Sequence, residues 1–397
     1  MDPTTLCPEV VRVSPYAEHF FFGYYDLQPW DSTGRRHLAH RVEFIDRIPR
    51  ADDAATVGYF EWDEPVVSGI RGAVPRAVFR AVGRTHAWNF QQGSMLQWNP
   101  ARPDREVIFN VRDGNRARAV IVDVETGAER KLLRPVASVN PDGKTALSVS
   151  FARMFSFRPG YGYASIPDPF AEKTVPEDDG VFSVDLETGA ARLLISTRAL
   201  WNAARSGAEA GDYKAFVNHI TWNTDGTRFV VLLRYTGKKG RRTAVLVVEA
   251  DERASGKVNV VIPFGYASHY WWIDADSLLF HSDGPDGVGL YRIDLPSETF
   301  TLVEPELFSF DGHCSATRDG RFIVYDSYPT EAGYRRLFTY DTRDRSDLAI
   351  GAFHSPAKIT GDIRCDLHPR LSRDATILSF DSAHEGFRGL YLTRGPV

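Results

Sequence analysis

The chain alternates between short apolar runs and tight polar turns along nearly its whole length. The recurring unit is a short strand, a polar turn of the Asn/Asp-x-Asp-Gly kind, and a second strand rich in Val, Ile, Phe and Tyr. Asp-Gly and Thr-Gly steps supply the positive-φ positions that tight hairpins need. The unit begins at seven places: Tyr24, Met95, Val136, His219, His269, His313 and Leu367.

A further strand follows each hairpin, as in VIVDVETGAER and VFSVDLETGAAR. Repeats of four short strands are typical of propeller blades. We therefore predict an all-β fold, a seven-bladed β-propeller forming a single domain over residues 1–397. Long loop insertions are expected near 45–90, 151–180 and 196–215, and a strand near Val10 is expected to complete the last blade. A large β-sandwich is the alternative.

Composition narrows the class of protein. The 397 residues are 43% hydrophobic and 12% aromatic, which is enough for a packed core, and the net charge is −5. This mild acidity argues against a nucleic-acid partner, and no apolar run is long enough to predict a membrane span. The first residues lack the pattern of a secretory signal, and the three cysteines (Cys7, Cys314 and Cys365) make no disulfide framework, so we expect a cytoplasmic protein.

Four histidines occupy the same place before the turn in successive repeats. They are His219, His269, His313 and His368. In a propeller this place lies on the innermost strand, where imidazoles can share a metal ion, and Cys365 or Asp366 beside the last of them can add a thiolate or a carboxylate. Imidazole with thiolate favours zinc. The predicted ligands of a structural Zn²⁺ are His269, His313, Cys365 and His368. The alternative is that these histidines are structural, and no organic cofactor is expected.

Basic residues end the second strand of the first four repeats, whereas the later repeats end mostly in Asp. A cationic sector in an acidic protein indicates an anionic ligand that guanidinium groups bind in bidentate fashion. Flat aromatic rings and amides nearby suit sugar recognition, although they also suit ordinary core packing. The candidate binding residues are Arg41, Tyr24, Gln91, Gln92, Arg153, Arg158, Tyr161, Arg234 and His219.

The segments HFFFGYYDLQPWD and LAHRVEFIDR resemble the N-terminal blade of the propeller polysaccharide lyases. These include ulvan and rhamnosyl-glucuronate lyases and, more distantly, oligogalacturonate lyase; RPGYGY, DGH at 311–313 and CDLHP at 365–369 extend the resemblance over most of the chain. The resemblance implies that His19 and His40 flank the scissile bond, that Arg112 binds the uronate carboxylate, and that His and Cys ligands of the later blades hold a structural zinc. The family's catalytic Tyr has no counterpart in NFQQGSMLQW, where Gln92 or a neighbour takes its place.

The function predicted in this way is cleavage of a glycosidic bond at a uronic acid by β-elimination, with an anionic oligosaccharide or polysaccharide as substrate. The reaction needs a cation for the carboxylate, which Arg112 supplies with Arg41 or Arg234. It also needs a base, His19 or His40, and an acid, which is a tyrosine or the other histidine. The predicted catalytic set is His19, His40, Arg112 and Tyr25.

Two other functions fit the same sequence. The first is a non-catalytic propeller that binds an acidic oligosaccharide or a protein partner, because propellers host many functions. The second is a glycoside hydrolase, which needs two facing carboxylates. Asp26, Glu43 and Asp113 are the residues that could supply them.

Overall fold

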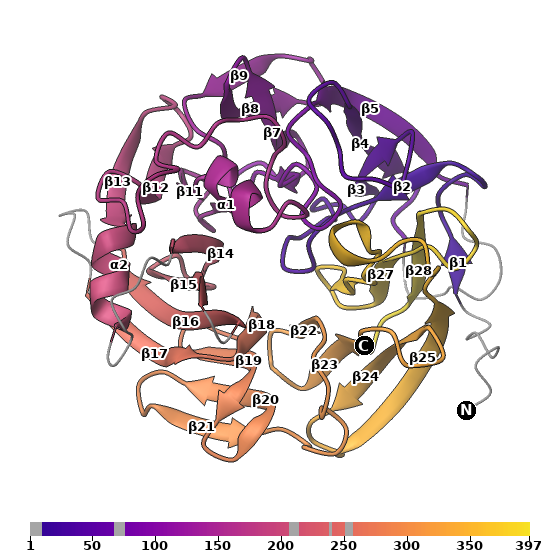
Figure 1. Cartoon of the computed structure of the whole chain (residues 1–397). Helices are drawn as coiled ribbons and strands as arrows, with labels where there is room; N and C mark the ends of the chain where they lie inside the picture. Colours follow the sequence, from indigo (N-terminus) through magenta and orange to yellow (C-terminus); the bar gives the residue numbers. More distant parts are fainter. Residues whose placement is uncertain (1–9, 67–75, 206–213, 238–239, 251–256) are drawn as a thin grey trace. The chain divides into compact units, whose positions relative to one another are not determined.

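The computed structural model describes residues 10–66, 76–205, 214–237, 240–250 and 257–397. Over these residues the strands form seven four-stranded sheets, the blades of a seven-bladed β-propeller (Figure 1). The fold class predicted from the repeats is therefore confirmed. Cys7 and the first residues of the chain, on which the expectation of no secretory signal rests, lie outside the described ranges.

The first six blades each consist of four strands that are consecutive in the sequence. The first blade consists of β2 (His19–Phe21), β3 (Arg36–Val42), β4 (Ala55–Glu61) and β5 (Val78–Thr85). The second consists of β6 (Gln97–Trp98), β7 (Glu106–Asp113), β8 (Arg116–Asp123) and β9 (Glu129–Leu132). The third consists of β10 (Ser138–Val139), β11 (Thr145–Ser148), β12 (Gly180–Asp185) and β13 (Ala191–Ser196). The next three are β14 (Phe216–Trp222), β15 (Arg228–Gly237), β16 (Gly240–Glu249) and β17 (Val258–Gly265); β18 (Ala267–Trp272), β19 (Ser277–Gly284), β20 (Gly287–Asp294) and β21 (Thr299–Leu302); and β22 (Cys314–Ala316), β23 (Phe322–Asp326), β24 (Tyr334–Asp341) and β25 (Ser346–His354).

The last blade combines both ends of the described chain. Its strands are β26 (Arg370–Leu371), β27 (Ile377–Ser382), β28 (Gly389–Arg394) and β1 (Val11–Arg12). In this antiparallel pairing, Val11 lies opposite Leu392 and Arg12 opposite Tyr391. The prediction that a strand near Val10 completes the last blade is confirmed.

Short helices occupy two of the expected insertions. Helix α1 (Phe151–Phe157) begins after Ser150, and α2 (Thr197–Ala204) begins after Ser196; each serine oxygen accepts a backbone N–H of the first turn. A 3-10 turn, η1, spans Gly361–Ile363. The expected insertion at 45–90 also holds β4 and β5, and its residues 67–75 lie outside the described ranges. No helix in the described part of the chain has the length and apolar character needed to cross a membrane.

The turn residues behave as their chemistry requires. In the turn between β14 and β15, the Asn223 side-chain oxygen accepts the backbone N–H groups of Thr227 and Arg228. Gly226 has a φ of +74°, and a Cβ there would lie 2.4 Å from the side-chain oxygen of Asn140. Only glycine fits this position, because the backbone is left-handed and a neighbouring side chain fills the space.

The chain divides into two compact units. The first comprises Met1–Val111, Ile121–Glu129 and Gly312–Val397, and the second comprises Arg112–Val120 and Arg130–Asp311. In the first unit, Phe20 and Trp62 pack with Leu390 in a buried apolar cluster. In the second unit, a similar cluster contains Val245, Tyr270 and Phe280. Each unit therefore has its own core, and the candidate sites below are described within one unit at a time.

Candidate functional site

Three buried side chains of the first unit converge in a way that suits a metal ion. The potential ligand atoms of His313, Asp366 and His368 all lie within 4.8 Å of one another. His313 immediately precedes β22, and His368 lies two residues before β26, so both imidazoles come from the start of a blade's first strand. We call these three residues the metal-capable cluster.

The two imidazoles of this cluster are held through their Nδ1 atoms. His313 Nδ1 donates to Asp326, with both carboxylate oxygens at 3.0 Å, and His368 Nδ1 donates to the Gly23 carbonyl at 2.8 Å. The Nε2 atom of His368 is buried and has no hydrogen-bond partner among the described residues. Burial, followed by the charge of His313, lowers the pKa of His368 well below its ordinary value, so its ring is neutral. Neutral imidazoles oriented in this way are typical of metal ligands.

The carboxylate of the cluster is held by two guanidinium groups. Asp366 pairs with Arg335 at 2.8 Å and with Arg364 at 2.7 Å. Burial acts to raise the pKa of Asp366, but the charges of Arg364 and Arg335 outweigh it and lower the pKa below the ordinary value. Asp366 is therefore an ionised donor that can share its charge with a cation. For Asp326, the carboxylate that His313 contacts, burial raises the pKa to about 6.

Two imidazole nitrogens and one carboxylate oxygen fit several divalent ions. Zinc, manganese and iron all accept such donors, and further positions remain for water or a ligand. The predicted tyrosines lie beside this donor set. The ring centroids of Tyr25 and His313 are 5.1 Å apart, and those of Tyr24 and His368 are 5.2 Å apart.

Two of the four predicted zinc ligands lie elsewhere. Cys365 packs in an apolar cluster with Ile359 and Ala383, and burial raises the pKa of its thiol to about 11, which keeps it protonated. His269 belongs to the second unit, where it pairs with Asp311. The cluster therefore contains neither Cys365 nor His269. Its third donor is the Asp366 carboxylate, which the sequence analysis named as an alternative to the Cys365 thiolate.

The His269–Asp311 pair has the geometry of a base held by a carboxylate. His269 Nδ1 donates to Asp311 Oδ1 at 2.9 Å, and the Ser268 hydroxyl donates to Asp311 Oδ2 at 2.7 Å. Burial acts to raise the pKa of Asp311, but the charge and hydrogen bond of His269 lower it below the ordinary value. This arrangement leaves Nε2 as the basic nitrogen of the imidazole. Asp311 belongs to the DGH segment at 311–313, but sequence reasoning gave it no role because it lies in a loop outside the repeat pattern.

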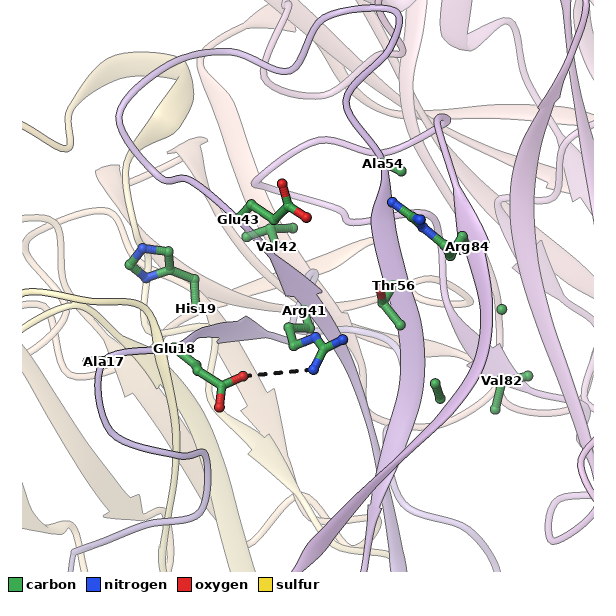
Figure 2. Close-up of a pocket in the computed structure, with 12 residues that line it drawn as sticks. Ala17, Glu18, His19, Arg41, Val42, Glu43, Ala54, Thr56, Val82 and Arg84 are labelled. Atoms are coloured by element: carbon green, nitrogen blue, oxygen red, sulfur yellow. Dashed lines mark ion pairs between the residues drawn. The ribbon is translucent and has the colours of Figure 1, made fainter.

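A pocket of about 770 Å³ in the first blade brings together His19 and Arg41 (Figure 2). Glu43 and Arg84 also line it, and Arg41 Nη1 lies 3.8 Å from Glu18 Oε2. Burial and then the charge of Arg388 lower the pKa of His19, so its ring is neutral near pH 7. One predicted catalytic residue and one predicted binding residue therefore share this pocket.

His40 is placed differently from His19. It is fully buried, its Nδ1 donates to the Phe22 carbonyl at 2.9 Å, and its Nε2 accepts the Ser94 backbone N–H at 3.0 Å. Burial lowers its pKa to about 4. Both ring nitrogens are used inside the fold, so His40 does not present a base to a ligand.

Several predicted binding residues make internal contacts instead of lining an open cleft. Arg153 is 2% exposed; it pairs with Asp168 at 3.1 Å and donates to four backbone carbonyls. Gln91 and Gln92 are also buried, and the Gln91 amide donates to the Arg364 carbonyl. These contacts give Arg153 and Gln91 a structural role, whereas the buried Gln92 side-chain oxygen has no hydrogen-bond partner among the described residues.

The other predicted binding residues belong mainly to the second unit. The Arg158 guanidinium lies 3.8 Å from the ring centroid of Tyr161 and donates to the Asn218 side chain. The buried His219 ring packs 4.8 Å from Tyr270. Arg112 donates to the Gly114 carbonyl at the β7–β8 turn, and the buried Arg234 donates to the Ala267 carbonyl. For the hydrolase alternative, Glu43 lies in the first-blade pocket and Asp113 pairs with Arg118.

No family model and no curated protein match this sequence. Solved structures do match. An oligogalacturonate lyase in complex with manganese is 14% identical, with a TM-score of 0.66 over 98% of this chain and 93% of that one. An oligogalacturonate lyase from Vibrio parahaemolyticus is also 14% identical, with a TM-score of 0.63 over 98% and 95%. The β-propeller domain of the Trilobed protease from Pyrococcus furiosus is 13% identical, with a TM-score of 0.52 over 94% of both chains. At these identities the likeness shows a shared β-propeller fold.

Proposed function

We propose that this protein is a lyase that cleaves oligosaccharides next to a uronic acid by β-elimination. The observation that carries the proposal is the metal-capable cluster, in which two imidazoles, of which that of His368 is neutral, and one ionised carboxylate converge in a buried site. The likeness to oligogalacturonate lyases, one of them solved with manganese, supports the same reaction.

The cluster suits a divalent cation because the buried Nε2 of His368 needs a partner there. His313, Asp366 and His368 would hold the ion. A metal ion bound there would supply positive charge to polarise a substrate carboxylate, which makes the neighbouring C5–H bond more acidic. Manganese and zinc both accept this donor set. Arg335 and Arg364 keep Asp366 ionised, and so keep the cluster ready for a cation.

β-Elimination transfers one proton to a base and one to a leaving group. The base takes the C5 proton, the electron pair of that bond forms the C4–C5 double bond, and the C4–O4 bond breaks with protonation of O4. We propose His19 as the base, since it lies in the same unit as the metal-capable cluster and its lowered pKa leaves it neutral near pH 7. Tyr25, also of the first unit, is proposed as the proton donor.

The test is the ultraviolet absorbance of the unsaturated uronate product. Wild-type protein with Mn²⁺ or Zn²⁺ is expected to produce it from oligogalacturonides or from glucuronate-containing oligosaccharides, but not from neutral galactose oligomers. His368→Ala is expected to lower bound metal per chain and turnover together. His354→Ala, a change at an exposed histidine of β25, is the matched control and is expected to leave both unchanged.

The base is tested by the same assay. His19→Ala is expected to lower turnover by a factor of about 100 or more while substrate binding changes little, because a general base acts only in the transition state. Unchanged turnover in His19→Ala would refute this assignment of the base. Full turnover in the His368→Ala variant, or no product from any uronate glycan with metal bound, would refute the proposed reaction.

A non-catalytic role in binding acidic oligosaccharides is the second candidate. It is favoured by the absence of a tyrosine from residues 89–98, where all three glutamines are buried. Binding of oligogalacturonides without product would support this role.

A further inference from the structure

The second unit contains a pocket of about 470 Å³ that none of the residues discussed for catalysis lines. Its lining comes from the β7–β8 turn, the segment between β9 and β10, and the long connection between β11 and β12. The volume lies within the range of about 300–1,000 Å³ that small-molecule sites occupy. We call it the Arg134 pocket, after its central cationic residue.

The Arg134 guanidinium is held in place on one side only. Its Cζ lies 3.5 Å from the ring centroid of Phe182, and its Nε donates to the Ser148 hydroxyl at 3.4 Å. Ser148 and Phe182 are directly opposite each other on β11 and β12, so one strand pair supports the whole side chain. Among the described residues Arg134 forms no ion pair, and its two Nη groups are left for a ligand.

The position of this guanidinium is unusual for an arginine without a carboxylate partner. Burial lowers the pKa of Arg134, and the charge of Asp179 acts in the opposite direction. Asp179 is 4% exposed, and burial raises its own pKa. The two side chains do not form an ion pair, although both line the pocket. The backbone of Asp179 is held in place, because Thr197 donates twice to its carbonyl. The pocket thus offers a guanidinium donor and a carboxylate acceptor.

The remaining walls are apolar. Phe151, Phe170 and Pro167 contribute to them, and the ring of Phe151 is stacked on Tyr163 at 4.5 Å, which makes that wall rigid. An apolar wall suits the C–H face of a sugar ring, while hydroxyl groups need acceptors such as a carboxylate. The combination favours a ligand with a flat apolar face, hydroxyl donors and one negative charge.

We propose that the Arg134 pocket binds a single uronic-acid unit, whose carboxylate pairs with Arg134 and whose hydroxyls donate to Asp179. A planar carboxylate matches the paired Nη groups of a guanidinium. A dianionic phosphate fits less well, because the carboxylates of Asp178 and Asp179 line the same pocket. The inference shares its ligand class with the proposed function, but binding here requires neither turnover nor a metal ion.

The first test uses wild-type protein in a chelating buffer, with an arginine-specific dicarbonyl reagent and mass spectrometry of the peptide that contains Arg134. Galacturonic acid is expected to protect Arg134 from modification, whereas galactose and acetate at equal concentration are expected to protect it poorly. Equal protection by galactose would show that the carboxylate is not recognised. Equal protection by acetate would show a site for any small carboxylate. Either result would overturn the proposal, as would the absence of protection.

The second test compares two variants by calorimetric titration with galacturonic acid. Arg134→Met is expected to weaken binding about tenfold or more, because a bidentate charge-assisted contact is lost. Arg192→Met, at an exposed residue of β13 that does not line this pocket, is the matched control and is expected to change binding little. Equal affinity of wild type and Arg134→Met would overturn the proposal. If Arg134→Met does not unfold cooperatively, the protection of wild-type Arg134 still decides the question. Both tests measure binding and need no turnover. A lyase assay without product would therefore refute the proposed reaction without refuting binding of a uronic acid in the Arg134 pocket.

Discussion

Replacement of His40 by alanine separates a structural role from a catalytic one. In the native fold the His40 ring is stacked on Phe21 with centroids 5.0 Å apart, and it bridges the Phe22 carbonyl and the Ser94 N–H. All of these groups are buried. His40→Ala therefore removes a donor and an acceptor from a place that bulk water does not reach.

The cost can be worked out from these contacts. Each buried polar group left without a partner costs about 1–3 kcal/mol, and the ring also leaves a cavity. We expect His40→Ala to lower the free energy of unfolding by about 3–5 kcal/mol. Urea unfolding at pH 7, followed by tryptophan fluorescence, measures this change, and His354→Ala serves as the exposed-histidine control.

The pH dependence gives an independent check. The pKa of His40 is lowered from 6.5 to about 4, so the unfolded chain binds the extra proton more readily than the native protein does. The contribution is fully present above pH 6.5 and is lost as pH falls toward 4, by up to about 3 kcal/mol. His40→Gln, which does not titrate, is expected to show a flatter stability profile over this interval.

The result that would refute this reasoning is specific. If His40→Ala keeps its full stability at pH 7 and loses lyase turnover, His40 acts on substrate and its buried position does not describe the working state. If the variant is destabilised and keeps turnover under conditions in which it is folded, the structural role stands.

Three further changes test other contacts. Gly93→Ala is expected to destabilise the fold by about 1–3 kcal/mol in urea unfolding, since its φ is +59° and a Cβ would lie 2.3 Å from His40 Cε1; unchanged stability would mean that the His40 ring can move. Arg153→Met is expected to cost about 3–5 kcal/mol and to speed tryptic cleavage nearby, because it leaves the Asp168 carboxylate buried and unpaired. The thiol of Cys365, whose pKa burial raises to about 11, is expected to react with iodoacetamide only in urea; native labelling seen by peptide mapping would contradict its buried position.

The repeat pattern predicted the fold because each blade is locally encoded. The turn glycines and the strands on either side lie within a few residues of one another, so the left-handed backbone of Gly226 can be predicted from its turn, although its close contact with Asn140 cannot. The same holds for β1, whose apolar sequence matched the missing strand of the last blade.

The candidate site was only partly predictable because its partners come from distant parts of the sequence. Comparison of the internal repeats placed His313 and His368 at equivalent positions, and these two imidazoles do converge in the structure. It could not show that His269 faces Asp311, which lies 42 residues later, or that Cys365 points into an apolar cluster while its neighbour Asp366 meets two arginines. Cys365 and Asp366 lie in the irregular segment between η1 and β26, where no strand periodicity predicts the direction of neighbouring side chains.

His40 and His368 show how two buried histidines of one unit can be assigned different roles. Their Nδ1 atoms donate to consecutive carbonyls, those of Phe22 and Gly23, at 2.9 and 2.8 Å. The rings differ at Nε2: Ser94 satisfies this atom in His40, whereas in His368 it has no hydrogen-bond partner among the described residues and faces Asp366 at 3.8 Å. A buried nitrogen lone pair without a donor is unfavourable unless a cation or ligand uses it. Both rings are held by the Phe22–Gly23 backbone, and only the second nitrogen of each ring distinguishes the structural His40 from His368, a candidate metal ligand.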